Sequence, residues 1–254
     1  MPAQPSTLLT LSFIALALAL GAGFVAAVRA AGPADEPPHV RARWTLGAAA
    51  ATLAWLALTG ALAQAGLFAF GAMPPPLLAL MGGVFIALTA LTVGPVGRRL
   101  ALGLPMAALV GFQAFRILVE LLLHRAHVEG LIPIQMSYLG YNFDVLSGLT
   151  ALILIPLIAS GRAPRWLIGA WNALGLALLL TIVTISILSA PVPFRAFHEG
   201  PANVFVTFFP FVWLPTVLVA AALLGHMLVL RRLLHDRRAH AHRALTPSLA
   251  EPRA

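Results

Sequence analysis

Polar and ionisable residues recur at regular intervals on one segment of a largely apolar chain. Gln113, Arg116, Glu120, His124 and His127 follow one another at steps of three and four residues. At 100° per residue they fall within an arc of about 80°, so a helix over this segment has one polar face. An arginine and a glutamate four residues apart can pair on a helix. We therefore expect an Arg116–Glu120 pair that faces the interior of a helical bundle.

The segment 130–144, which follows this helix, holds Gln135, Asn142 and Asp144. It is too long for a tight turn and too apolar for a solvated loop, so we expect it to fold back onto the bundle. Asn142 or Asp144 is well placed to cap the next helix, because Asn and Asp are preferred at that position. Asp144 thus has two interpretations, helix capping and ligand binding, and a cap can also line a site.

A later loop brings more polar groups to the same side, followed by two prolines. Arg195 and His198 lie in the loop 191–203, and Pro210 and Pro215 stand five residues apart at the start of the last apolar segment. Proline removes an N–H donor and clashes with the carbonyl four residues earlier, so we expect a kink or break there. Carbonyls freed at membrane depth need surrounding protein or a water-filled cavity, which favours a cavity wall. A kink that serves packing alone is the alternative.

The composition places these residues in a membrane protein. Of the 254 residues, 60% are apolar and 9% are charged, against about 45–50% and 25% in soluble domains. The chain has no cysteine and no lysine, which excludes disulfides, thiolate metal sites and Schiff-base chemistry. The expected partner is the lipid bilayer and not nucleic acid, and the sequence identifies no cofactor.

The apolar segments predict seven membrane spans. A span needs about 20 apolar residues, and the candidates are 7–29, 45–70, 76–97, 100–124, 143–160, 166–190 and 205–230. No basic residue precedes the first span, so we expect it to stay as an anchor and not to be cleaved as a signal peptide.

The arginines predict the orientation, because basic residues concentrate in cytoplasmic loops. Only Arg125 and Arg195 fall on one side of the seven spans. The other side holds Arg29, Arg41, Arg43, Arg98, Arg99, Arg162, Arg165, Arg231, Arg232, Arg237, Arg238, Arg243 and Arg253. The sequence thus predicts an all-α integral membrane protein of seven helices in a bacterial inner membrane, with its N-terminus outside and its C-terminus cytoplasmic. Residues 1–232 form the single transmembrane domain, and 233–254 form a disordered basic tail.

Ionisable residues inside a membrane are expensive and commonly mark a ligand, ion or proton site. We expect an outward-opening polar pocket that binds a small polar or anionic ligand, or a proton-coupled substrate, for transport or sensing. Arg116 is then the anion or counter-ion partner and Glu120 the titratable group. The candidate ligand-binding residues are Arg116, Glu120, His124, Gln135, Asn142, Asp144, Arg195 and His198.

Four alternatives remain open at this point. The Arg116–Glu120 pair would serve helix packing alone, or the chain would be an enzyme acting on a lipid or isoprenoid at the outer leaflet. A third alternative is a subunit or assembly factor with a protein partner and no ligand of its own. Haem or metal at His124, His127 and His198 lacks a diagnostic ligand spacing. We expect His226, near the inner end of the last span, to be a packed or snorkelling residue far from the outer cluster.

Five sequence blocks carry a family resemblance over about residues 110–230. They are Phe115–Arg116 with Glu120, Ile134–Asp144, Trp171–Asn172, Ser189–Phe194 and Phe209–Pro215. Together they resemble a bacterial group of multi-spanning membrane proteins that are usually left as hypothetical. The resemblance implies an inner-membrane bundle of about seven helices and carries over no substrate or reaction.

Overall fold

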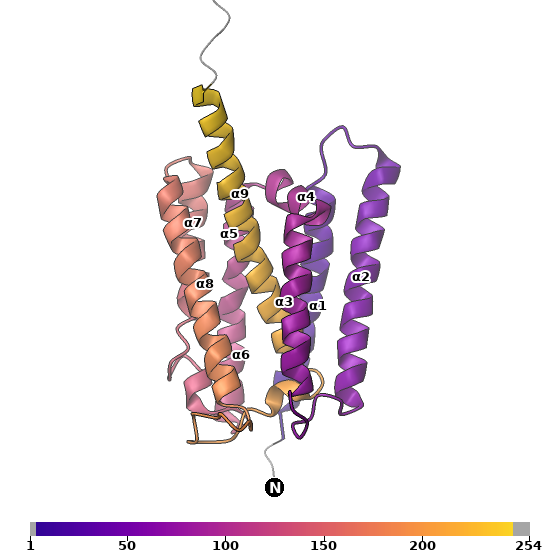
Figure 1. Cartoon of the computed structure of the whole chain (residues 1–254), viewed down its shortest axis with the longest axis vertical. Helices are drawn as coiled ribbons and strands as arrows, with labels where there is room; N and C mark the ends of the chain where they lie inside the picture. Colours follow the sequence, from indigo (N-terminus) through magenta and orange to yellow (C-terminus); the bar gives the residue numbers. More distant parts are fainter. Residues whose placement is uncertain (1–3, 246–254) are drawn as a thin grey trace, which may run out of the picture.

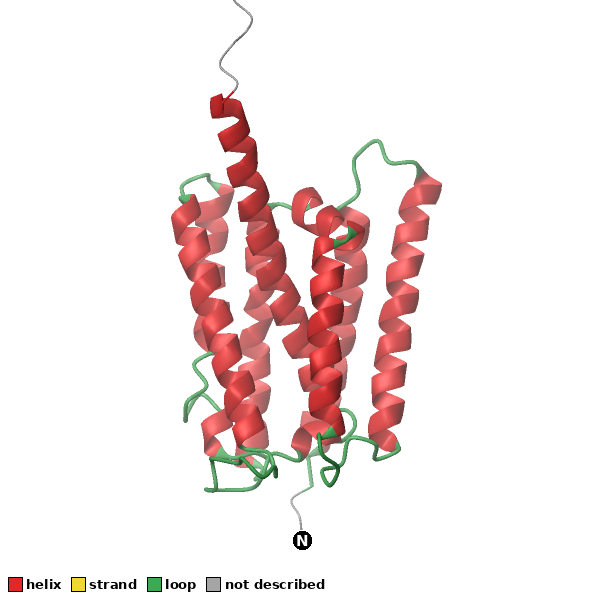
Figure 2. Cartoon of the chain, in the orientation of Figure 1, coloured by secondary structure: helices red, strands yellow, loops and turns green. Residues whose placement is uncertain are grey.

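The computed structural model describes residues 4–245, and this part of the chain is a bundle of helices without strands (Figures 1 and 2). The α-helices are α1 (Thr7–Ala30), α2 (Pro38–Gln64), α3 (Pro76–Val93), α4 (Pro95–Gly103), α5 (Met106–Gly111), α6 (Phe115–Val128), α7 (Val145–Ala159), α8 (Arg165–Leu188) and α9 (Ala220–Leu245). Short 3₁₀ turns η1 (Phe112–Ala114), η2 (Ile134–Met136) and η3 (Phe205–Thr207) and a π-helix η4 (Leu214–Val219) complete it.

Among the described residues 4–245, six helices are long and apolar enough to cross a membrane. Their ranges are Thr7–Ala30, Pro38–Gln64, Pro76–Val93, Met106–Val128, Arg165–Leu188 and Leu214–Ala239. The chain is therefore a multi-pass membrane protein. The predicted span at 143–160 corresponds to α7, whose 15 residues extend about 22 Å, less than the roughly 30 Å hydrocarbon core.

Helix α7 is short because both of its ends are fixed by local structure. Asp144 precedes its first residue inside the bundle, and the loop before it supplies the remaining depth with Ile132 and Met136 buried. Non-helical backbone at that depth is tolerated where protein surrounds it. At the other end Gly161 adopts φ +70°, a left-handed conformation that favours glycine after a helix. The expectation that 130–144 folds back on the bundle is confirmed.

Prolines explain where several helices begin. Pro38, Pro76 and Pro95 each occupy the first turn of their helix, where the missing N–H has no intrahelical partner in any case. Pro105 separates α4 from α5, so the span that was expected from residue 100 begins at Met106. The span that was expected from residue 205 begins at Leu214, after a stretch that is broken at Pro210. These shifts change the depth at which the polar residues lie.

The break near Pro210 and Pro215 is confirmed. Residues 205–212 form a 3₁₀ turn, a bend and further turns, and the π-helix η4 carries Pro215 at its start. The hydrogen-bond pattern of the helix widens there, as expected where a proline removes a donor.

The span formed by η4 and α9 crosses the middle of the bundle and touches α3, α4, α5 and α8 (Figure 1). Helix α2 stands at the edge beside α1. Helix α1 belongs to the core, because Phe13 is fully buried and packs edge-on against Phe205 and Phe211.

Glycine allows a close approach between α6 and α7. A Cβ added at Gly148 would lie 3.2 Å from the backbone nitrogen of Ile117 and 3.4 Å from the carbonyl oxygen of Ala114. Small residues let helix backbones approach in this way in membrane proteins. Gly148 lies one turn after Asp144, so this contact holds the start of α7 against the polar face of α6.

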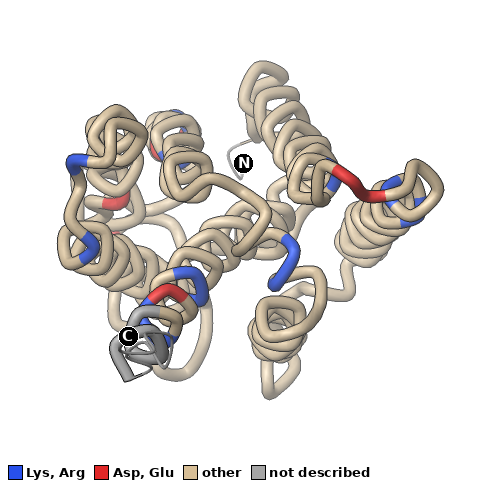
Figure 3. The backbone as a smooth tube through the Cα atoms, turned by 90° about the horizontal axis from the view of Figure 1, so that it is seen from above, with Lys and Arg blue, Asp and Glu red and all other residues tan. Residues whose placement is uncertain are grey.

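The long connections, residues 129–144 and 189–213, lie at the end of the bundle that holds the N-terminus (Figure 2). At the opposite end, the loop that joins α1 and α2 carries acidic residues with basic residues beside them (Figure 3). Helix α9 continues through Leu245, into the segment 233–254 for which a disordered tail is expected; residues 246–254 lie outside the described part of the chain.

Candidate functional site

The charged centre of the bundle is a bidentate pair between two helices. Arg116 on α6 donates from Nε to Oδ2 of Asp144 at 2.7 Å and from a terminal nitrogen to Oδ1 of the same carboxylate. Both side chains are buried. The Arg116–Glu120 pair expected from the four-residue spacing is therefore wrong. The fold-back of residues 130–144 brings a second carboxylate to the guanidinium in a geometry that matches its two parallel donors.

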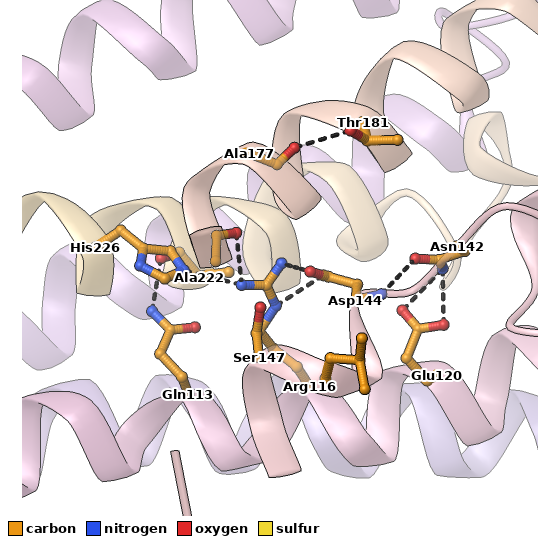
Figure 4. A network of polar contacts seen from close by, with 12 residues as sticks. Gln113, Arg116, Glu120, Asn142, Asp144, Ser147, Ala177, Thr181, Ala222 and His226 are labelled. Carbon is orange, nitrogen blue, oxygen red and sulfur yellow. Dashed lines mark hydrogen bonds and ion pairs between the residues drawn. The ribbon is translucent and has the colours of Figure 1, made fainter. Parts of the chain in front are cut away.

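Glu120 has a different partner. The side-chain nitrogen of Asn142 lies 2.8 Å and 2.7 Å from the two carboxylate oxygens and 3.1 Å from the carbonyl oxygen of Met136. An amide nitrogen has two hydrogens, so they are shared among three acceptors. Among the described residues, the partner of the Glu120 carboxylate is thus a neutral amide, whereas the partner of the Asp144 carboxylate is a guanidinium (Figure 4).

His226 of α9 completes the cluster, which corrects the expectation that it lies far from it. Its Nε2 is 2.9 Å from a terminal nitrogen of Arg116, and its Nδ1 is 2.9 Å from Oδ1 of Asn172 on α8. A guanidinium only donates, so Nε2 must accept and Nδ1 carries the proton. The geometry therefore requires a neutral imidazole with one tautomer.

The error about His226 came from the helix limits. Arg116 is ten residues after Met106, and His226 is twelve residues after Leu214, which is about 15 Å and 18 Å at 1.5 Å per residue. The two spans run in opposite directions, so both residues lie near the middle of the membrane. With the spans expected to start at residues 100 and 205, Arg116 and His226 were placed at different depths in the membrane.

Gly175 on α8 makes room for this arrangement. Its carbonyl oxygen accepts a hydrogen bond of 3.3 Å from Arg116. A Cβ at this position would lie 2.5 Å from Cε1 and 3.0 Å from Nε2 of His226. Real contacts are not that short, so a larger residue would displace the imidazole from the guanidinium.

Asp144 precedes α7, but its carboxylate does not cap it. The side chain makes no hydrogen bond to the first turn, since both of its oxygens bind Arg116. Instead, the backbone N–H of Asp144 donates to Oδ1 of Asn142 at 3.2 Å. Asn142 thereby joins the two carboxylates, and a continuous polar chain runs from Glu120 to His226 (Figure 4).

A cavity of about 130 Å³ adjoins this cluster. Its walls are apolar side chains of α3, α6, α8 and η4, among them Met81, Val183 and Pro215. Glu120 and Asp144 contribute to its lining, whereas Arg116 does not. The cavity therefore combines a long apolar wall with two carboxylates.

The helices that surround this cavity lie in a region that matches a family model. The model is a domain of unknown function, DUF8737, and it covers residues 73–234. The chain belongs to this family. No curated protein and no solved structure matches it. The DUF8737 region contains every residue of the polar cluster, and it contains α3 to α8 entire.

The DUF8737 region also contains a buried acceptor without a partner. Asn203 lines the cavity and is 1% exposed. Its amide nitrogen donates to the backbone and hydroxyl oxygens of Ser186, at 3.1 Å and 2.8 Å, and its Oδ1 has no hydrogen-bond partner among residues 4–245. An unsatisfied buried acceptor is costly. It therefore points to a donor from a bound molecule or water.

The structure places the other predicted ligand residues around the end of the bundle where α1 begins (Figure 1). Gln135 is buried and donates to the carbonyl of Glu199 at 3.5 Å, which joins the loop 129–144 to the loop 189–213. The ring of His124 stacks on Tyr138 with centroids 4.6 Å apart. Arg195 binds carbonyl groups of its own loop, and His198 is exposed. These four residues do not line the cavity.

Within residues 4–245, no three His, Asp or Glu side chains are grouped so that they could hold a metal ion. The sequence prediction missed His226, Asn172 and Asn203 as site residues. Asn172 and His226 had a signal, since each is a strongly polar residue within an otherwise apolar span. Asn203 had none, because its loop carries several polar residues.

Glu129 ties the segment before α1 to the C-terminal end of α6. It accepts from the hydroxyl and backbone N–H of Ser6, at 2.5 Å and 2.8 Å, and from Arg125 at 2.6 Å. Burial alone would raise the pKa of Glu129, but these hydrogen bonds outweigh it and lower the pKa.

Proposed function

We propose that this DUF8737 protein binds an amphiphilic molecule within the membrane, for transport or sensing. The apolar chain of the ligand would lie along α3 and α8, and its polar head would donate hydrogen bonds to Glu120, Asp144 and Asn203. The observation that carries the proposal is the cavity itself, with apolar walls, two carboxylates and an amide oxygen that has no partner among residues 4–245.

The same observation favours a donor head group over the anionic ligand that we expected from Arg116. Both carboxylate oxygens of Asp144, the carbonyl of Gly175 and the ring of His226 already engage the guanidinium. Arg116 does not line the cavity. An anion entering it would instead meet two carboxylates.

Ligand binding can be tested by thermal unfolding of the purified protein in mild detergent, followed by tryptophan fluorescence. Ligand bound to the native state raises the midpoint by mass action. We expect decanol, which has a hydroxyl donor, to raise it and methyl decyl ether, which has none, to leave it unchanged.

Two variants of α8 make this test specific. Val183 lines the cavity, whereas Leu180 is 55% exposed on the same helix. Val183→Phe fills the cavity and should abolish the decanol response, and Leu180→Phe should retain it. Equal responses to decanol in the two variants would contradict the proposal.

We also propose that α7 completes a seventh crossing, with the N-terminus outside and the C-terminus in the cytoplasm of a bacterial cell. The support is the excess of arginine at the ends of the helices on one side of the bundle. Because the chain has no cysteine, single-cysteine variants need no background substitution.

Exposed Tyr141 and Ser160 flank α7 and lie on opposite sides in this topology. A membrane-impermeant maleimide should label Tyr141→Cys in intact cells and Ser160→Cys only after the membrane is opened. The reverse pattern would invert the topology, and labelling of both positions in intact cells would show that α7 does not cross.

A further inference from the structure

The polar cluster carries one cation for two carboxylates. Arg116 is the guanidinium, Asp144 and Glu120 are the carboxylates, and His226 is neutral because its Nε2 accepts from Arg116. An uncompensated charge near the bilayer centre is costly. The cluster is therefore neutral only when it holds one additional positive charge.

The groups around Glu120 show where that charge belongs. Arg116 and His124 are on its own helix, and Asp144 immediately precedes α7. Tyr138 of the loop 129–144 stacks on His124, and His226 of α9 lies beyond Arg116. The parts of α3, α8 and η4 that line the cavity contribute no titratable side chain. The guanidinium of Arg116 binds both carboxylate oxygens of Asp144. Among the described residues of the cluster, Glu120 is therefore the carboxylate without a cation.

We infer that Glu120 exchanges a proton for the cationic head of an amphiphile, so that the protein binds a monovalent organic cation of the ammonium or guanidinium class. This inference deepens the proposed function and rests on it. Glu120 carries a proton when the cavity is empty, and the carboxylate pairs with the head group when the cavity is occupied.

The exchange conserves charge and atoms. The protonated carboxyl of Glu120 releases H⁺ to the solvent as its O–H bond breaks, and the electron pair stays on the carboxylate oxygen. The ligand cation then pairs with this carboxylate, so the cluster stays neutral before and after the exchange. No group is oxidised or reduced.

The lining of the cavity suits a cation with N–H donors. Glu120 and Asp144 provide carboxylate oxygens, and Oδ1 of Asn203 is an acceptor without a partner. The amide of Asn142 uses only some of the hydrogen-bond acceptor positions of the Glu120 carboxylate. A head group with several N–H donors can therefore bind the remaining lone pairs, while the apolar walls select a chain over a small hydrated ion.

Proton release on binding tests the exchange directly. Decylguanidinium is the probe, because a guanidinium stays protonated near neutral pH and any released proton must come from the protein. We expect about one proton released per decylguanidinium bound in weakly buffered detergent solution, and none on binding decanol. By linkage the affinity for decylguanidinium should rise about tenfold per pH unit while Glu120 remains protonated in the empty protein.

Three variants serve as controls. Glu120→Gln has no proton to release and should neither bind decylguanidinium nor release protons when it is added. Glu199→Gln removes an exposed carboxylate outside the cavity and should behave as the wild type. Val183→Phe fills the cavity, so proton release from this variant measures the background from decylguanidinium that enters the detergent micelles.

The outcomes separate the two proposals. If decylguanidinium binds the wild type without proton release, or if Glu120→Gln releases as many protons, the exchange is overturned and the amphiphile site stands. If neither decanol nor decylguanidinium binds, both proposals fail. The wild-type measurement decides the exchange even if Glu120→Gln does not fold.

Discussion

Two bidentate arginine–carboxylate pairs lie in different parts of this bundle. Arg99 on α4 binds both oxygens of Glu36, at 2.5 Å and 2.7 Å, as Arg116 binds both oxygens of Asp144. Arg99 also donates to the carbonyl of Val28 at 2.8 Å and lies 5.1 Å from the ring centroid of Trp44. This first pair fastens the loop between α1 and α2 to α4.

The two pairs differ in what surrounds them. Glu36 has a second cation, because Arg41 lies 3.4 Å from it, and the pair sits at the end of the helices. The pair of Arg116 lies near mid-membrane, shares its cluster with a second carboxylate, and adjoins a cavity. An ion pair thus indicates a fastening where no carboxylate lacks a cation, and a binding site where a neighbouring carboxylate lacks one and a cavity adjoins it.

The largest difference between the pairs should appear on removing each arginine. Arg116→Ala leaves Asp144 charged in the bundle, and breaking a buried pair typically costs about 3–5 kcal/mol. We expect a clearly smaller loss for Arg99→Ala, since water can reach the loop end. Unfolding in mixed micelles with increasing SDS measures both losses. Equal losses would remove the distinction between the pairs.

The packing around Arg116 should be nearly as sensitive. Gly175→Ala places a Cβ against His226, and overpacking of this kind costs about 1–3 kcal/mol. Gly169 on the same helix is the matched control, because a Cβ there would meet only Leu233, at 3.9 Å. The same SDS titration compares the two. A Gly175→Ala variant as stable as Gly169→Ala would show that the imidazole position is not fixed.

Removing the second carboxylate should have a small effect on stability. Glu120→Gln replaces a protonated carboxyl by a neutral amide of similar shape, so we expect a change below about 1 kcal/mol, as for many neutral polar replacements. A loss as large as that of Arg116→Ala would mean that Glu120 is charged in the empty protein.

The smallest effect concerns acid stability at the loop pair. The hydrogen bond from Arg99 lowers the pKa of Glu36 from its ordinary value of 4.5, although burial opposes it. The stabilisation from Glu36 is therefore present above its unfolded pKa and lost as the pH falls through the lower folded pKa. The thermal midpoint of the wild type should fall relative to Glu36→Gln as the pH drops below about 4.5. Parallel pH profiles would contradict this assignment.

The sequence could predict the membrane class, the polar face of α6 and the break at Pro210, because apolar length, helical period and proline each act locally. It could not predict the partners of Arg116. Spacing along one helix favoured Glu120, whereas the fold-back of residues 130–144 and the close approach at Gly148 deliver Asp144. The role of His226 depended on helix starts at Met106 and Leu214, and an apolar run without strong end signals does not fix these.

The account depends most on the protonation state of Glu120, and infrared difference spectroscopy measures it directly. Spectra of the wild type minus Glu120→Gln, in mild detergent at neutral pH, should contain the C=O band of a protonated carboxyl. Saturating decylguanidinium should remove this band and produce carboxylate bands. A spectrum with only carboxylate bands before the cation is added would contradict the assignment of the exchangeable proton to Glu120.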